Sequence, residues 1–470
     1  MQTHRTLRQA FRVVFSLSLF LSLTLSSACG STPSQSIRSR HIVLATTPEG
    51  SMEDRPVVDY VEDRHATLIR FTDLARDLPQ LRLELQRARP TFVTVILRAD
   101  QLTTNNVFAF YEAAASLDPD PFADFCYGFV PYDTPATLAQ WVKSVKIFDF
   151  RRDRVLIGAA IYEAAGENTA RKETLPWASN LPLTTLRVKP DDWAFVKANN
   201  GSLELANLIL LNGPAKPAME LKMESQVVVS ALHLFPPHDA DPNLPTSIKL
   251  ATSLINRGAV AILGPMEGDS ATVTRAEFDR CISSTGTLGA VIKRTWDAAI
   301  LALGGKATLP RFEKGKPDPT EWQRHPRELA AMSRVLIGDP SMEPFTRACA
   351  APVTLLNAFE KMEAGNVTTT VARVAVSQPD IASAFLDPYT LENGVFADGV
   401  HLVIELPPTT HEALADLASS ELDTIGVAAR VNAQAFESLD EKAYMHVLVG
   451  GAPDAFRKKN LTFTISIRRK

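Results

Sequence analysis

Continuous apolar segments that alternate with amphipathic stretches constrain the fold of this chain more than any other feature. Strand-like apolar segments lie at 42–45, 92–97, 122–130, 208–211, 227–234 and 259–263, and stretches with helical spacing lie at 106–117, 138–145, 247–256 and 287–303. Strands that are apolar along their whole length are buried on both faces, as in parallel sheets covered by helices. The region is therefore predicted to be α/β, with a mainly parallel sheet and helices on both faces.

Two stretches of this region are harder to assign. Residues His65 to Arg87 have helical character, although Pro79 would interrupt or end such a helix because proline lacks the N–H donor. Residues 149–192 mix short apolar and polar runs and predict no single type of element.

In the last part of the chain, the apolar residues follow a different spacing. Segments at 367–376, 400–406, 425–431, 444–450 and 461–467 alternate apolar and polar residues, and turn signals such as Glu392-Asn393-Gly394 separate them. Several short alternating strands predict an antiparallel β-sandwich of the immunoglobulin-like kind.

The N-terminus has the three parts of a secretory signal peptide. Arg5, Arg8 and Arg12 make a positive start, and residues 13–25 form an apolar run shorter than the roughly 20 residues that span a bilayer. Small residues then precede Cys29, as in a lipobox. We expect Cys29 to be lipidated and the protein to be exported and lipid-anchored to the bacterial cell envelope, on its periplasmic or cell-surface side. Ordinary cleavage after Ala28, without acylation, is the alternative.

These patterns divide the chain into five parts. They are a signal peptide at 1–28, a lipid-anchored polar tether at 29–40, an N-terminal α/β subdomain at 41–150, a second α/β subdomain at 151–350 and a β-sandwich at 351–470. About 430 residues after the tether correspond to two or three domains of about 150 residues each.

Composition argues against several functional classes. The net charge is −4, and positive and negative residues are interspersed, so the sequence has no basic cluster of the kind that binds nucleic acid. Only Cys126, Cys281 and Cys349 follow Cys29, too few for a disulfide framework, although one bridge could form. No paired Cys or His spacing indicates zinc, so no metal or cofactor is expected apart from a calcium ion considered below.

Three segments resemble the gingipain-type cysteine peptidases, which are related to the caspases. The segment at 118–128 (DPDPFADFCYG) resembles the family's "D-P-x-x-D-x-x-Y-G", and the one at 254–264 (LINRGAVAILG) resembles its "R-G-A-x-A-x-x-G" strand. The segment at 336–344 (LIGDPSMEP) resembles its closing "L-x-G-D-P-x-x-x-P". The order is that of the family, in which a β-sandwich also follows the catalytic unit. The resemblance implies a caspase-like fold, with 151–350 equivalent to the catalytic unit.

The catalytic positions depart from this resemblance. In the family, a His-Gly at one strand end supplies the general base, and a Cys at the end of the next strand is the nucleophile. Here the first strand ends in Asn212-Gly213, and an amide cannot accept a proton at neutral pH. The second strand ends in Ser230-Ala231-Leu232-His233, without a cysteine. We therefore expect a pseudoenzyme.

Other polar residues could form a ligand-binding rim near these strand ends, where open α/β sheets collect their ligands. His233, His238 and Asp239 share one loop, and Glu267 and Asp269 follow the third strand, where paired carboxylates could hold calcium. A solvated polar loop is the simpler interpretation of both groups.

Three hypotheses remain open. The first is a non-catalytic, gingipain-like lipoprotein that binds a peptide or protein, or supports an envelope assembly. The second is an active cysteine endopeptidase with a relocated dyad, for instance His233 with a cysteine brought near by the fold. The third is a periplasmic solute-binding lipoprotein, which the C-terminal β region fits poorly.

Overall fold

A computed structural model describes most of the chain from residue 40 onward. The described residues are 40–118, 120–154, 158–175, 181–189, 192, 194–196, 198–199, 206–212, 223, 225–232, 234, 248–266, 274, 277–278, 281–282, 287–303, 312–313, 316–317 and 330–345, followed by the strands given below. The predicted signal peptide, Cys29 and the tether up to residue 39 lie outside them.

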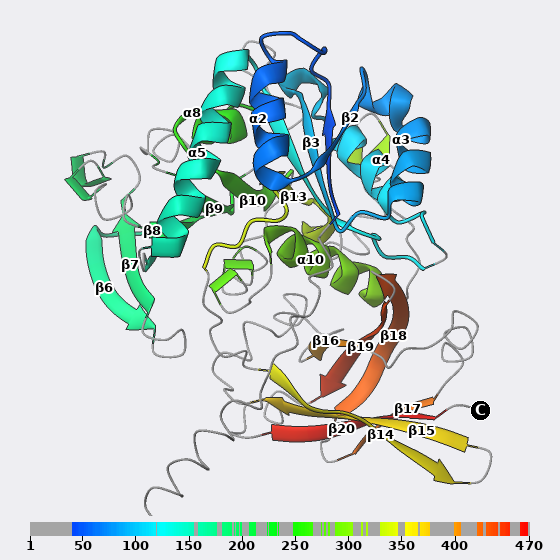
Figure 1. Cartoon of the computed structure of the whole chain (residues 1–470). Coiled ribbons are helices and arrows are strands. Elements are labelled where there is room, and N and C mark those ends of the chain that lie inside the picture. The colour runs from blue at the N-terminus through cyan, green and yellow to red at the C-terminus, as the bar shows by residue number, and fades with distance from the viewer. Residues whose placement is uncertain are drawn as a thin grey trace, which may run out of the picture. The chain divides into compact units, whose positions relative to one another are not determined.

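An eleven-stranded, mostly parallel sheet forms the centre of the α/β region (Figure 1). Its order is β2-β1-β3-β4-β13-β10-β9-β8-β5-β7-β6, so strands from both predicted subdomains share one sheet. The strands are β1 (His41–Ala45), β2 (Thr67–Arg70), β3 (Phe92–Arg98), β4 (Cys126–Tyr132), β5 (Gly158–Ala164), β6 (Thr169–Leu175), β7 (Leu181–Val188), β8 (Ala206–Asn212), β9 (Val227–Ser230), β10 (Ala261–Pro265) and β13 (Arg334–Gly338). The prediction of a mainly parallel α/β sheet is confirmed.

Two groups of helices accompany this sheet. One group contains α2 (Asp54–Arg64), α5 (Pro135–Arg154) and α8 (Ile248–Asn256), with α5 in contact with both others. The other contains α3 (Leu74–Ala88), α4 (Thr104–Ala114) and α10 (Leu288–Ala302), and a short 3-10 helix spans Ala99–Gln101. Their aromatic residues pack against each other, since Trp296 of α10 stacks on Tyr111 of α4 with ring centroids 4.3 Å apart. None of the described helices is long and apolar enough to cross a membrane.

The prediction of one helix from His65 to Arg87 was wrong in its first part. Thr67–Arg70 is a strand that pairs with β1, and α3 begins only at Leu74. Asp73 caps this helix, because its side chain accepts a hydrogen bond from the Arg76 N–H at 2.9 Å. Pro79 lies inside α3 without ending it.

The residues that carry the family resemblance meet in the centre of the sheet. Gly338 has φ +138°, a conformation that favours glycine, and a Cβ there would lie 2.7 Å from the Cβ of Ala261. Gly128 of β4 lies against the carbonyl oxygen of Gly338 in turn. One residue from each of the three motifs therefore takes part in the same close backbone packing.

The C-terminal strands form two antiparallel sheets. The first has the order β14-β15-β20-β17 and the second β16-β19-β18. Their bounds are β14 (Val353–Ala364), β15 (Val367–Val376), β16 (Gly399–Glu405), β17 (Glu421–Ile425), β18 (Ala429–Leu439), β19 (Lys442–Gly451) and β20 (Leu461–Arg468), and a separate two-stranded ribbon joins β11 (Phe312–Glu313) and β12 (Lys316–Pro317). That the two larger sheets pack as an immunoglobulin-like sandwich stays a prediction.

Candidate functional site

The two strand ends that correspond to the expected dyad lie side by side. β8 and β9 are parallel neighbours with Leu211 opposite Ser230, and the Ala231 N–H donates to the Leu211 carbonyl oxygen at 2.8 Å. Asn212 is the exposed last residue of β8 and lies opposite Glu163 of β5. The structure thus brings together Asn212 with the segment that begins at Ser230.

Other predicted site residues lie outside the described residues. These are Gly213, His233, His238, Asp239, Glu267 and Asp269, together with the lipidation site Cys29. Within the described part of the chain, no group of three or more His, Cys, Asp and Glu side chains could hold a metal ion.

The Ser230 side chain is engaged in its own turn. Ser230 is fully buried, its Oγ accepts a hydrogen bond from the Leu232 N–H at 3.0 Å, and it donates to the Leu232 carbonyl oxygen at 3.2 Å. A nucleophilic hydroxyl must face the substrate and an adjacent base. Ser230 therefore shapes the end of β9 and has the geometry of a turn residue.

A buried ion pair supports this strand end from inside. Arg334, the first residue of β13, donates from Nη1 to the Ser230 carbonyl oxygen at 3.0 Å and from Nε to Glu277 Oε2 at 2.9 Å. Both side chains of the Arg334–Glu277 pair are 0% exposed. Thr274 and Thr295 add hydrogen bonds to Ser230 and Glu277, and the Trp296 Nε1 donates to the Arg334 carbonyl oxygen at 2.9 Å.

This ion pair was not predicted from the sequence. Glu277 and Arg334 are 57 residues apart, so no local spacing connects them. The only signal was a charged residue at the head of an otherwise apolar strand, since charges are almost never fully buried unless paired. Because a guanidinium has donors but no acceptor, Arg334 cannot act as a general base. It fixes the position of the β9 carbonyl.

The described cysteines are not placed as nucleophiles. Cys126 is buried at the start of β4, and the Gly289 backbone lies against both Cys126 and Pro340. Arg334, which bonds Ser230, is the first residue of β13, whereas Pro340 follows the other end of that strand at Gly338, so Cys126 lies near the opposite end of β13 from Ser230. Cys281 is fully buried, and buried thiols are inert. Cys349 lies outside the described residues.

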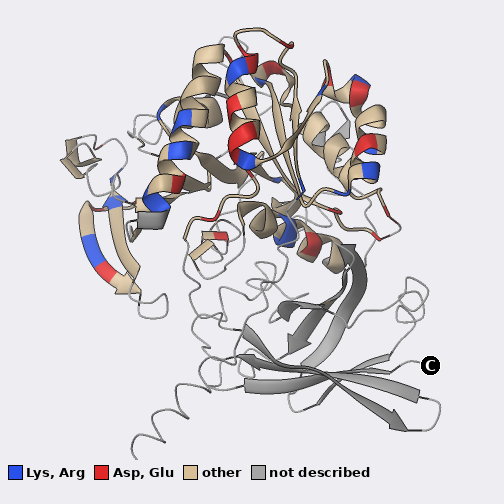
Figure 2. Ribbon diagram, viewed as in Figure 1, with Lys and Arg blue, Asp and Glu red and all other residues tan. Residues whose placement is uncertain are grey.

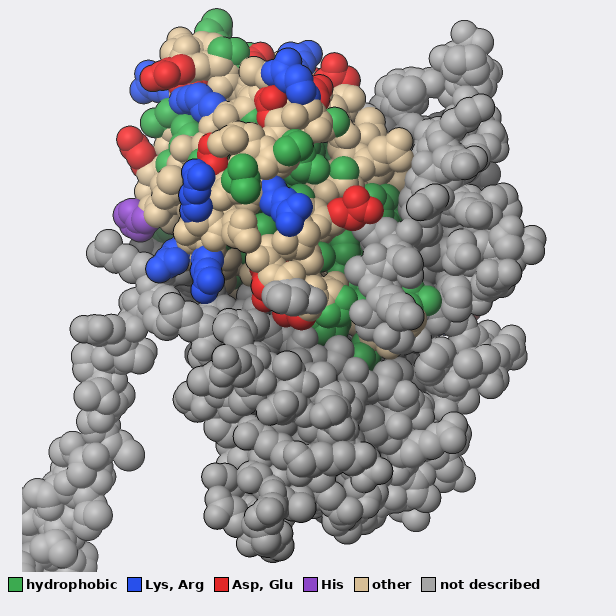
Figure 3. All heavy atoms as spheres, turned by 90° about the vertical axis from the view of Figure 1, so that its right-hand side faces the viewer, with side chains coloured by type: hydrophobic (Ala, Val, Ile, Leu, Met, Phe, Trp, Pro, Cys, Tyr) green, Lys and Arg blue, Asp and Glu red, His purple; other side chains and the backbone are tan. Residues whose placement is uncertain are grey.

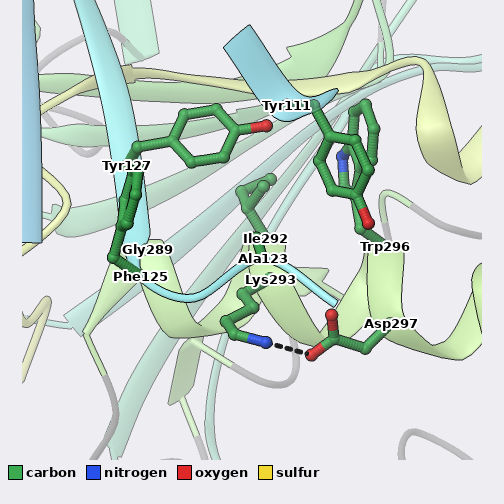
Figure 4. Close-up of a pocket in the computed structure, with 9 residues that line it drawn as sticks. All are labelled: Tyr111, Ala123, Phe125, Tyr127, Gly289, Ile292, Lys293, Trp296 and Asp297. Carbon is green, nitrogen blue, oxygen red and sulfur yellow. Dashed lines mark hydrogen bonds and ion pairs between the residues drawn. The ribbon is translucent and has the colours of Figure 1, made fainter. Parts of the chain in front are cut away.

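A small pocket lies elsewhere, between α4, β4 and α10 (Figure 4). Tyr111, Phe125, Tyr127 and Trp296 supply aromatic walls, and Lys293 Nζ binds Asp297 Oδ2 at 2.9 Å within it. Burial raises the pKa of Tyr127, and the negative charge of Asp297 adds to this rise. The Tyr127 hydroxyl therefore stays protonated at physiological pH.

Next to this pocket, the loop between α4 and β4 carries a carboxyl group with an unusual pKa. Burial and the neighbouring Asp118 raise the pKa of Asp124 to about 8, although the Leu117 N–H donates to its Oδ2 at 3.2 Å and Lys293 favours its charge. In the native state this carboxyl therefore holds a proton at pH values where ordinary aspartates are ionised.

The raised pKa of Asp124 predicts a stability that decreases with rising pH. Between the ordinary aspartate pKa near 4 and pH 8 the native state holds a proton that the unfolded chain has lost, so alkaline pH favours unfolding. We expect Asp124→Asn to flatten this slope in urea denaturation series run between about pH 5 and pH 8. Equal slopes for both proteins would contradict the assignment.

On the side of the molecule that carries α3 and α4, the surface charge is neither mainly positive nor mainly negative. In Figure 3, Lys and Arg side chains there alternate with Asp and Glu, and apolar side chains lie between them.

Comparison with known proteins gives only distant structural matches. No family model and no curated protein matches the chain. One solved structure, the complex of pro- and mature domains of Porphyromonas gingivalis RgpB, aligns at 13% identity and a TM-score of 0.43, covering 72% of this chain and 88% of that one. Another, described as the structure of a protease, aligns at 10% identity and a TM-score of 0.42, covering 72% of this chain and 89% of that one. At these values the family is not established by comparison.

Proposed function

We propose that this protein is an exported, lipid-anchored, gingipain-like protein with a caspase-like fold that has lost the His/Cys dyad and acts by binding. The observation that carries the proposal is the pair of adjacent strand ends at Asn212 and Ser230. An amide ends one strand, and a serine engaged in its own turn ends the other. Neither has the chemistry of a general base or an activated nucleophile.

The surroundings of these strand ends support the same conclusion. Arg334 and Glu277 neutralise each other inside the protein, so the Glu277 carboxylate is engaged by the guanidinium and the pair holds the strand end in place. Cys126 and Cys281 are buried, and a buried thiol cannot reach a polypeptide substrate. The ligand proposed for this edge is a peptide or protein, held by Asn212 and the neighbouring rim, and the C-terminal strands are proposed to be an immunoglobulin-like spacer or partner site.

The proposal predicts that the purified chain has no thiol-dependent peptidase activity. Casein and a mixed peptide library should remain intact, and iodoacetamide should label neither Cys126 nor Cys281 until the protein is unfolded, because both side chains are buried. Mass spectrometry of the labelled peptides measures this, with denatured protein as the control.

The opposite result would restore the peptidase hypothesis. If a native cysteine is labelled and its replacement by alanine abolishes proteolysis, the chain is an active enzyme with a relocated dyad. Lipid anchoring is tested separately, by the mass of the N-terminal peptide from the wild type and from Cys29→Ser, since only the wild type should carry acyl chains.

A further inference from the structure

The exposed face of α5 carries large apolar side chains beside cations. Phe150 is 58% exposed and Ile147 is 39% exposed, two of the four large apolar side chains found exposed among the described residues. Lys143, Ile147 and Phe150 follow one another at spacings of four and three, so they form one stripe along the helix. Folding within the described chain leaves this stripe in contact with solvent.

The charges around the stripe are unevenly distributed between two neighbouring helices. Residues 143–154 of α5 include five Lys or Arg residues and two aspartates, whereas α2 beside it carries mainly acidic residues (Figure 2). Lys146 Nζ bonds Asp63 Oδ2 of α2 at 2.6 Å, which partly neutralises that lysine. An anionic surface would therefore meet α5 favourably and would be repelled by α2, and this difference fixes the orientation of approach.

The stripe also lies near the point where the tether enters the fold. Arg64 bonds Asp149, the neighbour of Phe150, at 2.8 Å and Asp339 at 2.7 Å. His41, the first residue of β1, lies in the same neighbourhood: its Nε2 is 2.8 Å from Thr94 Oγ1, which also bonds the Tyr60 hydroxyl of α2 at 3.2 Å, and the Arg64 guanidinium lies 5.8 Å from the centre of the Tyr60 ring. Only residues 30–40 separate Cys29 from His41, and eleven residues reach at most about 40 Å. An acyl group on Cys29 would keep this end of the fold close to the bilayer.

We infer that the α5 stripe is a membrane-docking surface. Phe150 and Ile147 would enter the interface of the leaflet that carries the anchor, and Lys143 and Arg151 would lie among anionic phospholipid headgroups. Apolar area and electrostatic attraction act together in such interfacial binding. The inference rests on the lipid anchor of the proposed function, and it adds that the anchored protein lies on the membrane in one orientation.

Vesicle binding tests this inference independently of acylation. The processed chain from residue 29 onward, carrying Cys29→Ser so that no acyl group contributes, is sedimented with vesicles of phosphatidylcholine alone or with phosphatidylglycerol. We expect binding to the anionic vesicles that weakens with salt and falls by about tenfold or more in Ile147→Ala/Phe150→Ala. Leu83→Ala on α3, where the leucine is 47% exposed, is the matched control and should bind as before.

The possible outcomes separate the two proposals. Absence of vesicle binding, or equal losses in the α5 double variant and in Leu83→Ala, overturns the docking surface even when the N-terminal peptide is acylated. If vesicle binding depends on the stripe but Cys29 is not acylated in the wild type, the docking surface is supported and the lipid anchor is contradicted. Self-association that disappears in the double variant, seen by sedimentation velocity without vesicles, would show that a second copy covers the stripe and would also overturn the inference.

Discussion

Replacing Arg334 by alanine is expected to cost about 3–5 kcal/mol of unfolding free energy, the usual cost of breaking a buried ion pair. The variant would leave the Glu277 carboxylate buried without its guanidinium, and Glu277 is 0% exposed. It would also remove the donor to the Ser230 carbonyl oxygen at the end of β9. Since domains are stable by only about 5–15 kcal/mol, this loss removes a large share of the stability, and the variant should unfold at a much lower urea concentration than the wild type.

Two controls make the Arg334 experiment specific. The double variant Arg334→Met/Glu277→Leu removes both charges and should recover part of the loss, because apolar residues of similar volume often replace a buried pair without cost. Arg171→Ala breaks an exposed ion pair with Glu173, in which the arginine side chain is 75% exposed, and should cost less than about 1 kcal/mol. Urea denaturation followed by circular dichroism measures all three. A single-variant loss as small as that of Arg171→Ala would contradict the structural role given to Arg334.

The sequence predicted the central strands because their burial leaves a simple pattern. β8, β9 and β10 are buried at almost every position and appear as continuous apolar segments. The family resemblance also placed Asn212 and Ser230 at the ends of successive strands, and these strands are neighbours in the sheet. Where apolar residues cover both faces of an element, its type and its neighbours follow from local patterns.

The strands at the edges of the sheet were not predicted, because their side chains are exposed to solvent and no continuous apolar segment marks them. β6 is exposed or half-exposed along its length and carries Arg171, Lys172 and Glu173, so it has no apolar period to detect. β2 is likewise at a sheet edge with no fully buried residue, and the helical spacing of the following α3 was extended over it. Such strands are defined by their partners, which lie far away in the sequence.

The partners of the buried charges near the motifs could not be predicted from the sequence for a related reason. The Gly338-Asp339-Pro340 motif was recognised as a family feature, but its partners on α2 and at the start of β1 could not be read from the sequence. Asp339 binds Arg64, which precedes it by 275 residues (339 − 64), through an ion pair of 2.7 Å. Long-range pairing of this kind depends on the finished fold, whereas the motif itself is local.

This network gives the second large prediction, for Asp339→Asn. The Asp339 side chain is 0% exposed, accepts hydrogen bonds from the Ser341 N–H at 2.8 Å and the Ser341 Oγ at 2.6 Å, and pairs with Arg64. The asparagine oxygen can still accept the Ser341 bonds, so the substitution removes mainly the charge. We expect a loss of about 2–4 kcal/mol, below that of Arg334→Ala because Arg64 keeps its bond to Asp149.

The pH dependence of this loss distinguishes a charge effect from a packing effect. Burial alone would raise the pKa of Asp339, but Arg64, His41 and the Ser341 hydrogen bonds outweigh it and hold the pKa below its ordinary value. A carboxyl with a lowered native pKa stabilises the fold above its unfolded pKa near 4, and this contribution disappears as the pH falls through the native pKa. The difference between wild type and Asp339→Asn in urea denaturation should therefore be largest at neutral pH and shrink below about pH 4. A difference that stays constant down to acid pH would mean that shape at this position matters and the charge does not.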